Sequence, residues 1–205
     1  MSTPFVTLTS VAAPMLEDNI DTDIIIPSRE MKSTGKTGLA GGLFAGRRYR
    51  QGREENPDFV LNQPRWRKAA ILLAGDNFGC GSSREHAVWA LAEHGIRAVI
   101  APSFSPIFAG NAVRGGVLPL RLPREAVVAL AAAGGEIHID LPGQKVAAGE
   151  LSYDFAVDAE AKAMLIGGLD AIDLTLQFSD EIAGWQARDR AARPWVYDIV
   201  SPSNG

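Results

Sequence analysis

The chain has 205 residues, of which 46% are hydrophobic and 21% are charged, with a formal net charge of −4. This length suits one large domain or two small ones with a real core, and the acidic balance argues against a nucleic-acid binder, which needs a basic surface. No apolar run is long enough for a membrane span and no secretory leader follows Met1, so we expect a cytoplasmic protein. The single cysteine, Cys80, excludes an internal disulfide and cannot by itself hold zinc or an iron–sulfur cluster.

The N-terminal part of the chain is predicted to form two strands separated by an acidic turn. Residues 5–11 alternate between apolar and polar side chains, the pattern of an edge strand. Residues 24–26 are consecutive isoleucines ended by Pro27, and we expect them to form a short buried strand. Asp23 would then lie at the mouth of this strand, a typical place for a functional carboxylate. The acids at 17–23 indicate a solvated turn rather than an EF-hand, because the glycine and the distant glutamate of that motif are missing.

Residues 28–62 are predicted to form a long, basic, mobile loop, because glycines are interspersed with lysines and arginines along it. Loops longer than about fifteen residues usually serve as lids or binding segments, or are disordered. The positive charge favours a lid over an anionic substrate, and a solvated connection is the equal alternative. Gly35-Lys36-Thr37 resembles the end of a phosphate-binding loop, but Glu30 occupies the position of the first glycine, which excludes that motif.

The rest of the chain is centred on one motif at 75–87. Residues 69–74, directly before it, are continuously apolar, as in a parallel strand covered on both faces. Ser82 and Glu85 have the spacing of a capping box, which predicts that a helix begins at Ser82. That helix is expected to lead into a second apolar strand at 97–101. The motif is therefore predicted to be the turn of a strand–loop–helix–strand unit.

The chemistry of the motif predicts an anion-binding site with a candidate base. Gly75, Gly79 and Gly81 would let the backbone approach a ligand, and a helix start adds amide donors with a partial positive charge. Arg84 offers a planar fork for a carboxylate or a phosphate. Ser82 can act as a base only if amides and a cation stabilise its alkoxide, which this turn would supply. The alternative is a capped helix whose Arg84 pairs with a neighbouring acid.

The remaining sequence predicts further alternation of helices and strands, without an internal repeat. The histidines do not form a metal-binding cluster, although His86 would lie near the mouth of the predicted site. Ser179 is expected to cap the last helix, and residues 201–205 to form a disordered tail. The predicted helices cover 105–116, 124–133, 159–166, 171–177 and 179–190, and the predicted strands cover 117–120, 136–141, 145–148 and 151–157.

Three segments, 19–27, 75–87 and 111–119, resemble the small subunits of 3-isopropylmalate dehydratases in their order and spacing. The Gly-Ser-Ser-Arg-Glu-His-Ala signature in the second segment is highly specific to the aconitase superfamily. The resemblance covers most of the chain and implies the α/β swivelling domain of that superfamily, a β/β/α fold with a mixed sheet and flanking helices. We therefore expect a single domain over 1–200 that carries the long loop at 28–62.

The resemblance also implies an activity and a role for each motif residue. The expected reaction is the interconversion of 2-isopropylmalate and 3-isopropylmalate by dehydration and rehydration, a hydro-lyase step of leucine biosynthesis. Ser82 would be the base, while Arg84, Asp23, Ser83 and Lys36 would bind the small dicarboxylate, with Arg84 as the carboxylate clamp. A large subunit, the expected partner, would carry the [4Fe-4S] cluster, so this chain would bind no metal and would be inactive alone.

The chain departs from the family pattern in the segment that resembles the recognition element for the substrate's variable end. Many members have Thr-Arg-Thr-Gly where residues 35–38 read Gly-Lys-Thr-Gly, so Lys36 keeps the charge but lacks the bidentate fork. A paralogous small subunit that acts on citraconate, 2-methylmalate or dimethylmaleate is therefore an alternative. A non-catalytic subunit that binds RNA or another partner is a further alternative, against which the acidic charge and the intact Ser82, Arg84 and Asp23 argue.

Overall fold

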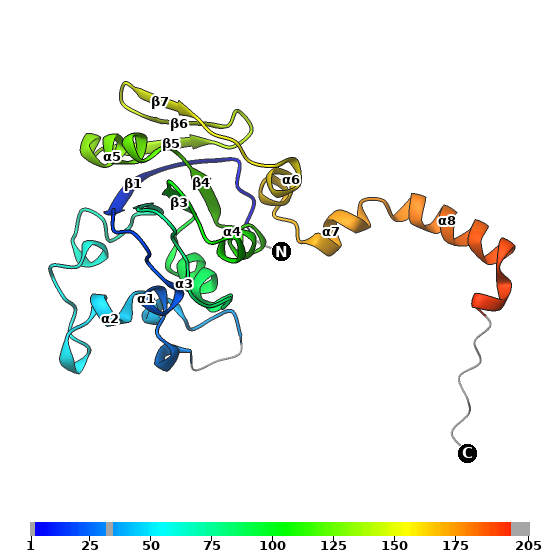
Figure 1. Cartoon of the computed structure of the whole chain (residues 1–205), viewed down its shortest axis with the longest axis horizontal. Helices are drawn as coiled ribbons and strands as arrows, with labels where there is room; N and C mark the ends of the chain where they lie inside the picture. The colour runs from blue at the N-terminus through cyan, green and yellow to red at the C-terminus, as the bar shows by residue number, and fades with distance from the viewer. Residues whose placement is uncertain (1–2, 32–34, 198–205) are drawn as a thin grey trace, which may run out of the picture. The chain divides into compact units, whose positions relative to one another are not determined.

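The computed structural model describes residues 3–31 and 35–197 (Figure 1), and the predicted tail at 201–205 lies outside the described residues. The chain divides into two units, of which the first ends at Leu169 and the second begins at Asp170. The first unit contains a seven-stranded sheet with its helices, and the described residues of the second, 170–197, contain helices alone. No helix in the described part of the chain is long and apolar enough to span a bilayer.

Seven strands form one mixed sheet in the first unit. They are β1 (Thr7–Met15), β2 (Ile71–Ala74), β3 (Ala98–Ala101), β4 (Leu118–Arg121), β5 (Glu136–Asp140), β6 (Lys145–Ala148) and β7 (Leu151–Asp154). Their order in the sheet is β4-β3-β2-β1-β5-β6-β7. Strands β1 to β4 run parallel to one another. Strand β5 pairs antiparallel with β1, β6 with β5, and β7 with β6. The predicted mixed sheet is therefore confirmed. The predicted edge strand at 5–11 is wrong, because β1 has a partner on each side.

Four helices of nine or ten residues cover both faces of the sheet. They are α3 (His86–His94), α4 (Pro106–Arg114), α5 (Arg124–Ala133) and α6 (Ala159–Gly167). Leu72 of β2 packs into one apolar core with α3 and α4, whereas Ile71 and Leu73 pack into a second core with α5 and α6. Successive side chains of a strand point to opposite faces, so a strand that is buried on both faces is apolar at every position.

The segment at 28–62 is folded into short helices where the structure describes it. They are η1 (Ser28–Glu30), η2 (Ala40–Gly42), α2 (Ala45–Arg48), η3 (Gln51–Arg53) and η4 (Val60–Asn62). Leu39, Phe44 and Leu61 bury their side chains in the same core as α3 and α4. The buried Arg48 donates from Nε to Asn62 Oδ1 over 3.1 Å. Spaced apolar residues thus give the segment a packed structure that its glycine and charge content does not predict.

The second unit consists of α7 (Ala171–Leu176), α8 (Ser179–Ala192) and η5 (Pro194–Val196). Asp170 caps α7 through a capping box with Asp173. The predicted capping of the last helix by Ser179 is wrong, because Ser179 is already the first helical residue and no side chain caps α8. Near the end of α8, the Asp189 carboxylate accepts hydrogen bonds from Arg193 Nε at 2.8 Å and from Tyr197 Oη at 2.6 Å. These bonds hold η5 against the end of α8.

Candidate functional site

The loops that follow β1 and β2 lie side by side at the carboxyl ends of these parallel strands. Their backbones are joined by four hydrogen bonds: Gly75 N to Glu17 O at 3.2 Å, Asn19 N to Asp76 O at 2.8 Å, Gly79 N to Ile20 O at 2.8 Å, and Thr22 N to Cys80 O at 2.9 Å. These bonds continue the parallel pairing of β1 with β2 beyond the strands themselves. Ligands of open α/β sheets bind outside the carboxyl ends of the strands, so the two loops are the natural place for a site.

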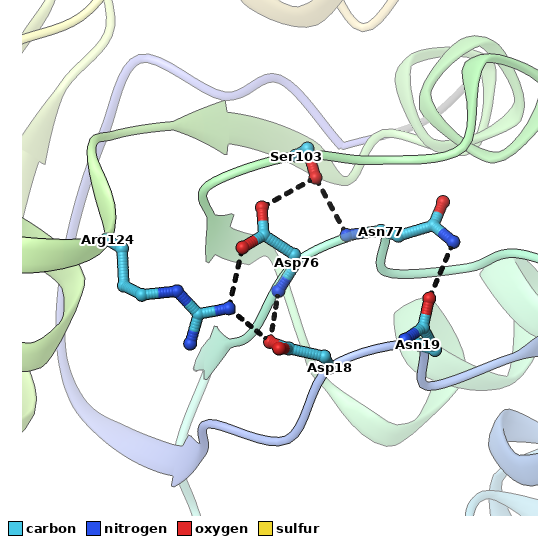
Figure 2. Close-up of polar contacts among 6 residues, drawn as sticks. All are labelled: Asp18, Asn19, Asp76, Asn77, Ser103 and Arg124. Carbon is cyan, nitrogen blue, oxygen red and sulfur yellow. Dashed lines mark hydrogen bonds and ion pairs between the residues drawn. The ribbon is translucent and has the colours of Figure 1, made fainter.

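A polar cluster ties these two loops to the loop after β3 and to the start of α5 (Figure 2). The guanidinium of Arg124 lies between two carboxylates, with Nη2 2.5 Å from Asp18 Oδ1 and 2.6 Å from Asp76 Oδ2. The Ser103 hydroxyl donates to Asp76 Oδ1 at 2.9 Å and accepts from the Asn77 amide at 2.8 Å. The hydrogen bonds from Arg124 are the main reason that the pKa values of Asp18 and Asp76 lie below their ordinary value. The cluster therefore joins three loops through charged hydrogen bonds.

Asp23 lies in the first turn of a short helix, α1 (Thr22–Ile25), and not at the end of a strand. The predicted strand at 24–26 is wrong. Asp21 sits at the N-cap, and its carboxylate accepts a hydrogen bond from the Ile24 amide at 2.7 Å. An aspartate cap supplies a partner for an amide that a helix start otherwise leaves free, and this local bond outweighs the strand preference of the isoleucines.

Asp23 and Arg84, two of the predicted site residues, are in direct contact. Asp23 Oδ1 forms an ion pair with Arg84 Nη1 and also accepts from Ser28 Oγ at 3.3 Å. Among the described residues, the other guanidinium nitrogens of Arg84 have no hydrogen-bond partner. The Arg84 side chain is 31% exposed. The free edge of its fork is therefore available to a planar anion.

Ser82 lies in a loop before α3, and its hydroxyl does not cap a helix. Helix α3 begins at His86 without a side-chain cap, so the predicted capping box of Ser82 with Glu85 is wrong. The Ser82 amide instead donates to Oγ1 of Thr22, a side chain that is only 1% exposed, at 3.1 Å. In the described part of the chain, the half-buried Ser82 hydroxyl has no hydrogen-bond partner. It is thus available to a ligand.

Ser83 is exposed, and α4 holds it through its backbone. Asn111 of α4, which is 6% exposed, donates from Nδ2 to the Ser83 carbonyl at 3.2 Å, and Arg114 donates to Asn111 Oδ1. Neither Asn111 nor Thr22 is predicted as a site residue from the sequence. Their only signal in the sequence is that they lie in the segments 19–27 and 111–119, which resemble the family. A buried polar group needs a hydrogen-bond partner, but the sequence does not show that these two side chains are buried.

Two of the three motif glycines are required by chain packing. At Gly79, where φ is +74°, a Cβ would lie 2.2 Å from Cγ of Phe108. At Gly75, a Cβ would lie 2.4 Å from the carbonyl oxygen of Glu17. The close approach that these glycines permit is thus between parts of this chain. For Gly81, where φ is +91°, the approach of a ligand stays a prediction.

Lys36 contacts helix α3. Its ammonium lies 5.7 Å from the ring centroid of Trp89. One turn further along α3, the Glu93 carboxylate accepts hydrogen bonds from the amides of residues 38–40 at 2.5 to 2.8 Å. These bonds, that from Gly38 foremost, lower the pKa of Glu93. Helix α3 therefore positions the segment that contains Lys36. The first residue of α3, His86, directly follows the loop that carries Ser82 and Arg84.

Most of the positive charge in the loop at 28–62 is paired within the chain. Arg48 is buried and bonded to Asn62, whereas Lys36 has no carboxylate partner among the described residues. Arg84 therefore supplies positive charge in the loop that carries Ser82, whereas the structure places Lys36 against Trp89 of α3. The ion pairs of the loop's described arginines are Arg29 and Arg53 with Glu30, Arg47 with Glu17, and Arg50 with Asp58.

The residues of this chain do not fit an iron–sulfur cluster. Cys80 is the only cysteine of the sequence, whereas such clusters are held by several cysteine thiolates. No three acidic, histidine or cysteine side chains in the described residues are grouped so that they could hold a metal ion. His94 is desolvated and lies beside Arg48, which together lower its pKa to about 4, so its ring is neutral at physiological pH.

Comparisons with known proteins find relatives over almost the whole length of the chain. The model of the Aconitase C-terminal domain matches residues 2–125, and the model of the C-terminal domain of the 3-isopropylmalate dehydratase small subunit matches residues 172–199. A 3-isopropylmalate dehydratase small subunit of Cupriavidus necator is 52% identical over 203 residues, which cover 95% of this chain and 98% of the relative. One of Rhodospirillum centenum is 48% identical over 199 residues, with 94% and 98% covered. A crystal structure of 3-isopropylmalate dehydratase from Methanocaldococcus jannaschii has a TM-score of 0.67 at 27% identity and covers 87% of this chain and 99% of that one.

Proposed function

The chain belongs to the family of 3-isopropylmalate dehydratase small subunits, and we propose on that basis that it is one half of a hydro-lyase of leucine biosynthesis. The reaction interconverts 2-isopropylmalate and 3-isopropylmalate by removing water and adding it back to the neighbouring carbon. The observation that carries the proposal is the similarity to small subunits over 95% of the chain. We place the complex in the cytoplasm and expect neither a membrane nor a nucleic acid among its partners.

Ser82 is proposed as the base that takes a proton from the substrate carbon next to a carboxylate. A serine hydroxyl is too weakly acidic to ionise at neutral pH unless positive charge or hydrogen-bond donors stabilise its alkoxide. The guanidinium of Arg84 lies two residues further along the same loop. The observation that supports this role is the half-buried hydroxyl of Ser82, which has no partner in the described part of the chain.

Arg84 is proposed as the clamp on a substrate carboxylate. Its ion pair with Asp23 fixes the guanidinium through one nitrogen, and the free edge of the fork is left for a second carboxylate. Ser83 and Lys36 complete the proposed binding set. Ser83 presents an exposed hydroxyl beside Arg84, and Lys36 presents an exposed ammonium on the segment that α3 positions.

The [4Fe-4S] cluster of such a hydro-lyase is assigned to a large subunit. This chain has one cysteine, which is too few for the cluster, and the relatives are named small subunits. The chain is therefore proposed to act only in a complex, to which it contributes Ser82 and the carboxylate clamp.

The identity of the substrate depends on the segment around Lys36. A lysine at this position binds an anion as a point charge and lacks the bidentate geometry of arginine. The leading proposal is isopropylmalate. The alternative is a smaller acid of the citraconate or dimethylmaleate type, which the substitution in residues 35–38 leaves open.

The test compares kcat/KM for three substrates, using the chain reconstituted anaerobically with its large subunit. Absorbance of the unsaturated species is followed with 3-isopropylmalate, citraconate and dimethylmaleate in parallel. The proposal expects the highest kcat/KM with 3-isopropylmalate. A higher kcat/KM with a smaller acid would move the chain to a paralogous hydro-lyase, and no turnover of any of them would remove the enzymatic assignment.

A further inference from the structure

The second unit of the chain presents large apolar side chains to solvent. Within the described residues, no side chain of α7, α8 or η5 is buried. Isolated helices shorter than about 12–15 residues are marginal in water, and here α7 has 6 residues and α8 has 14. Such helices need a surface to pack on. The exposed apolar side chains are Ile172 at 70%, Leu176 at 58%, Phe178 at 59%, Trp185 at 54% and Trp195 at 69%.

Several of these side chains recur at helical spacing. Ile182 and Trp185 lie three residues apart and share a face of α8, and Phe178, the N-cap residue of α8, precedes Ile182 by four residues. Ile172 and Leu176 are spaced i, i+4 on α7 and therefore also share a face. We call Phe178, Ile182 and Trp185 the apolar stripe. A stripe of this kind on a helix is the side that packs against another element.

We infer that residues 171–197 form a docking arm that holds the large subunit, with the apolar stripe at the centre of the contact. The inference rests on the proposed function, which supplies the large subunit. The arm coincides with a region matched at 172–199 by a model that is named for the small subunit, separate from the aconitase-type domain matched at 2–125. Because this region is specific to the small subunit, we expect it to bind the large subunit that the small subunit needs for activity.

The size of the apolar surface also fits this occupant. A stable interface of standard size buries about 800 Å² per partner, and a covered aromatic side chain contributes roughly 150–250 Å². Phe178, Trp185 and Trp195 are still 54–69% exposed, so together with Ile172 and Leu176 they could supply a substantial part of such an interface. Acidic and basic residues are mixed along the arm, so apolar burial and not charge steering would provide the affinity.

The test measures the affinity between the two purified subunits. The stripe variant carries Phe178→Ser and Trp185→Ser, and the matched control carries Asp180→Ser and Ala187→Ser on the opposite face of α8. Interface aromatics are often hot spots, so the stripe variant should raise the Kd for the large subunit by roughly 100-fold or more. The control should stay near the wild-type Kd. At saturating large subunit, the stripe variant should keep the wild-type kcat, because docking affects occupancy and not the chemical step.

If the docking arm binds something other than the large subunit, the same measurements give a different result. An unchanged Kd in the stripe variant overturns the inference. If the isolated wild-type chain is a dimer in sedimentation and the stripe variant is a monomer, the arm binds a second copy instead. If the stripe variant lowers the Tm of the isolated monomer well below that of the control, the arm packs within its own chain. Binding that depends on the stripe but gives no turnover of isopropylmalate would defeat the proposed function and leave the docking arm in place.

Discussion

Ser82 combines a fixed backbone with a free hydroxyl. The backbone amide is held by the buried Thr22, so the side chain is positioned without being used for capping. The residue types of the proposed site were predictable, since Ser82, Arg84 and Asp23 lie in recognisable motifs. The capping role predicted for Ser82 was wrong, because the capping-box spacing is local and the Thr22 bond comes from a distant segment.

Replacement of Ser82 by alanine tests its role directly. General base catalysis contributes typically about 10²–10⁴-fold to a rate, so Ser82→Ala should lower kcat of the reconstituted complex by roughly that factor with little change in KM. Steady-state kinetics with 3-isopropylmalate measure both constants. Ser152→Ala, at an exposed position of β7, is the control and should keep wild-type kinetics. A Ser82→Ala complex with normal kcat would rule out the proposed base.

Arg124 gives a residue-scale prediction on stability. A carboxyl whose pKa is lower in the folded chain stabilises the fold above its unfolded pKa, and this contribution is lost as the pH falls through the folded pKa. Asp18 and Asp76 are such carboxyls because of Arg124. Arg124→Met should therefore lower the Tm at pH 7, and its difference from wild type should shrink as the pH falls below about 4.

Calorimetric scans at a series of pH values measure this difference. The control is Arg121→Met, at an exposed arginine at the end of β4 that makes no ion pair among the described residues. Its Tm should follow the wild type at every pH. A difference for Arg124→Met that stays constant down to acid pH would show that the ion pairs are not its cause.

At the scale of elements, the loop that follows β2 can contact α4 only because Gly79 has no side chain. An alanine there would combine the strain of positive φ, about 1–2 kcal/mol, with overpacking against Phe108, about 1–3 kcal/mol. We expect Gly79→Ala to lower the free energy of unfolding by roughly 3 kcal/mol, measured by denaturant titration of the isolated chain.

Gly149→Ala separates these two causes. Gly149 has a φ of +58° and no atom within 4 Å of the added Cβ, so its substitution introduces only the backbone strain. It should cost about 1–2 kcal/mol. Equal losses for the two variants would mean that Phe108 yields to the new methyl group and that the close packing is not limiting.

The elements that sequence patterns predicted correctly are those whose signals are local. The strands around 71–74 and 98–101 are apolar runs in the sequence, and α4 begins with Ser105 and Pro106 as expected. The patterns failed where a contact from a distant segment, or a cap not considered, decides the structure. Asp21 converts the isoleucines into a helix, and Glu93 of α3 orders the segment at 38–40, for which the sequence shows no local signal.

At the scale of the whole molecule, the sheet changes from parallel to antiparallel at β1. The resemblance to the aconitase superfamily predicted a mixed sheet, but the alternation at 5–11 was interpreted as an edge strand with a partner on one side only. The pairing of β1 with both β2 and β5 joins segments that are far apart in sequence. Such long-range pairings have no local pattern, which is why the position of β1 was mispredicted.

The complete molecule also sets a limit on what this chain does alone. Because it lacks the thiolates for a cluster, the isolated, metal-free chain should show no dehydratase turnover with 3-isopropylmalate. Addition of the large subunit, to which we assign the cluster, should restore activity, which is measured by absorbance under anaerobic conditions. Turnover by the isolated chain would contradict the assignment of the cluster to the partner.

The central position of β1 in the sheet has a consequence for folding during synthesis on the ribosome. Thr7 pairs with Asp140, and Ala12 pairs with Ile71, so the first strand to leave the ribosome waits for both partners. Synthesis proceeds at about 5–20 residues per second, and β1 therefore spends several seconds as an unpaired strand. During that time its hydrogen-bonding edges are open to chaperones and to other nascent chains. The sheet can close only after more than half of the polypeptide has emerged.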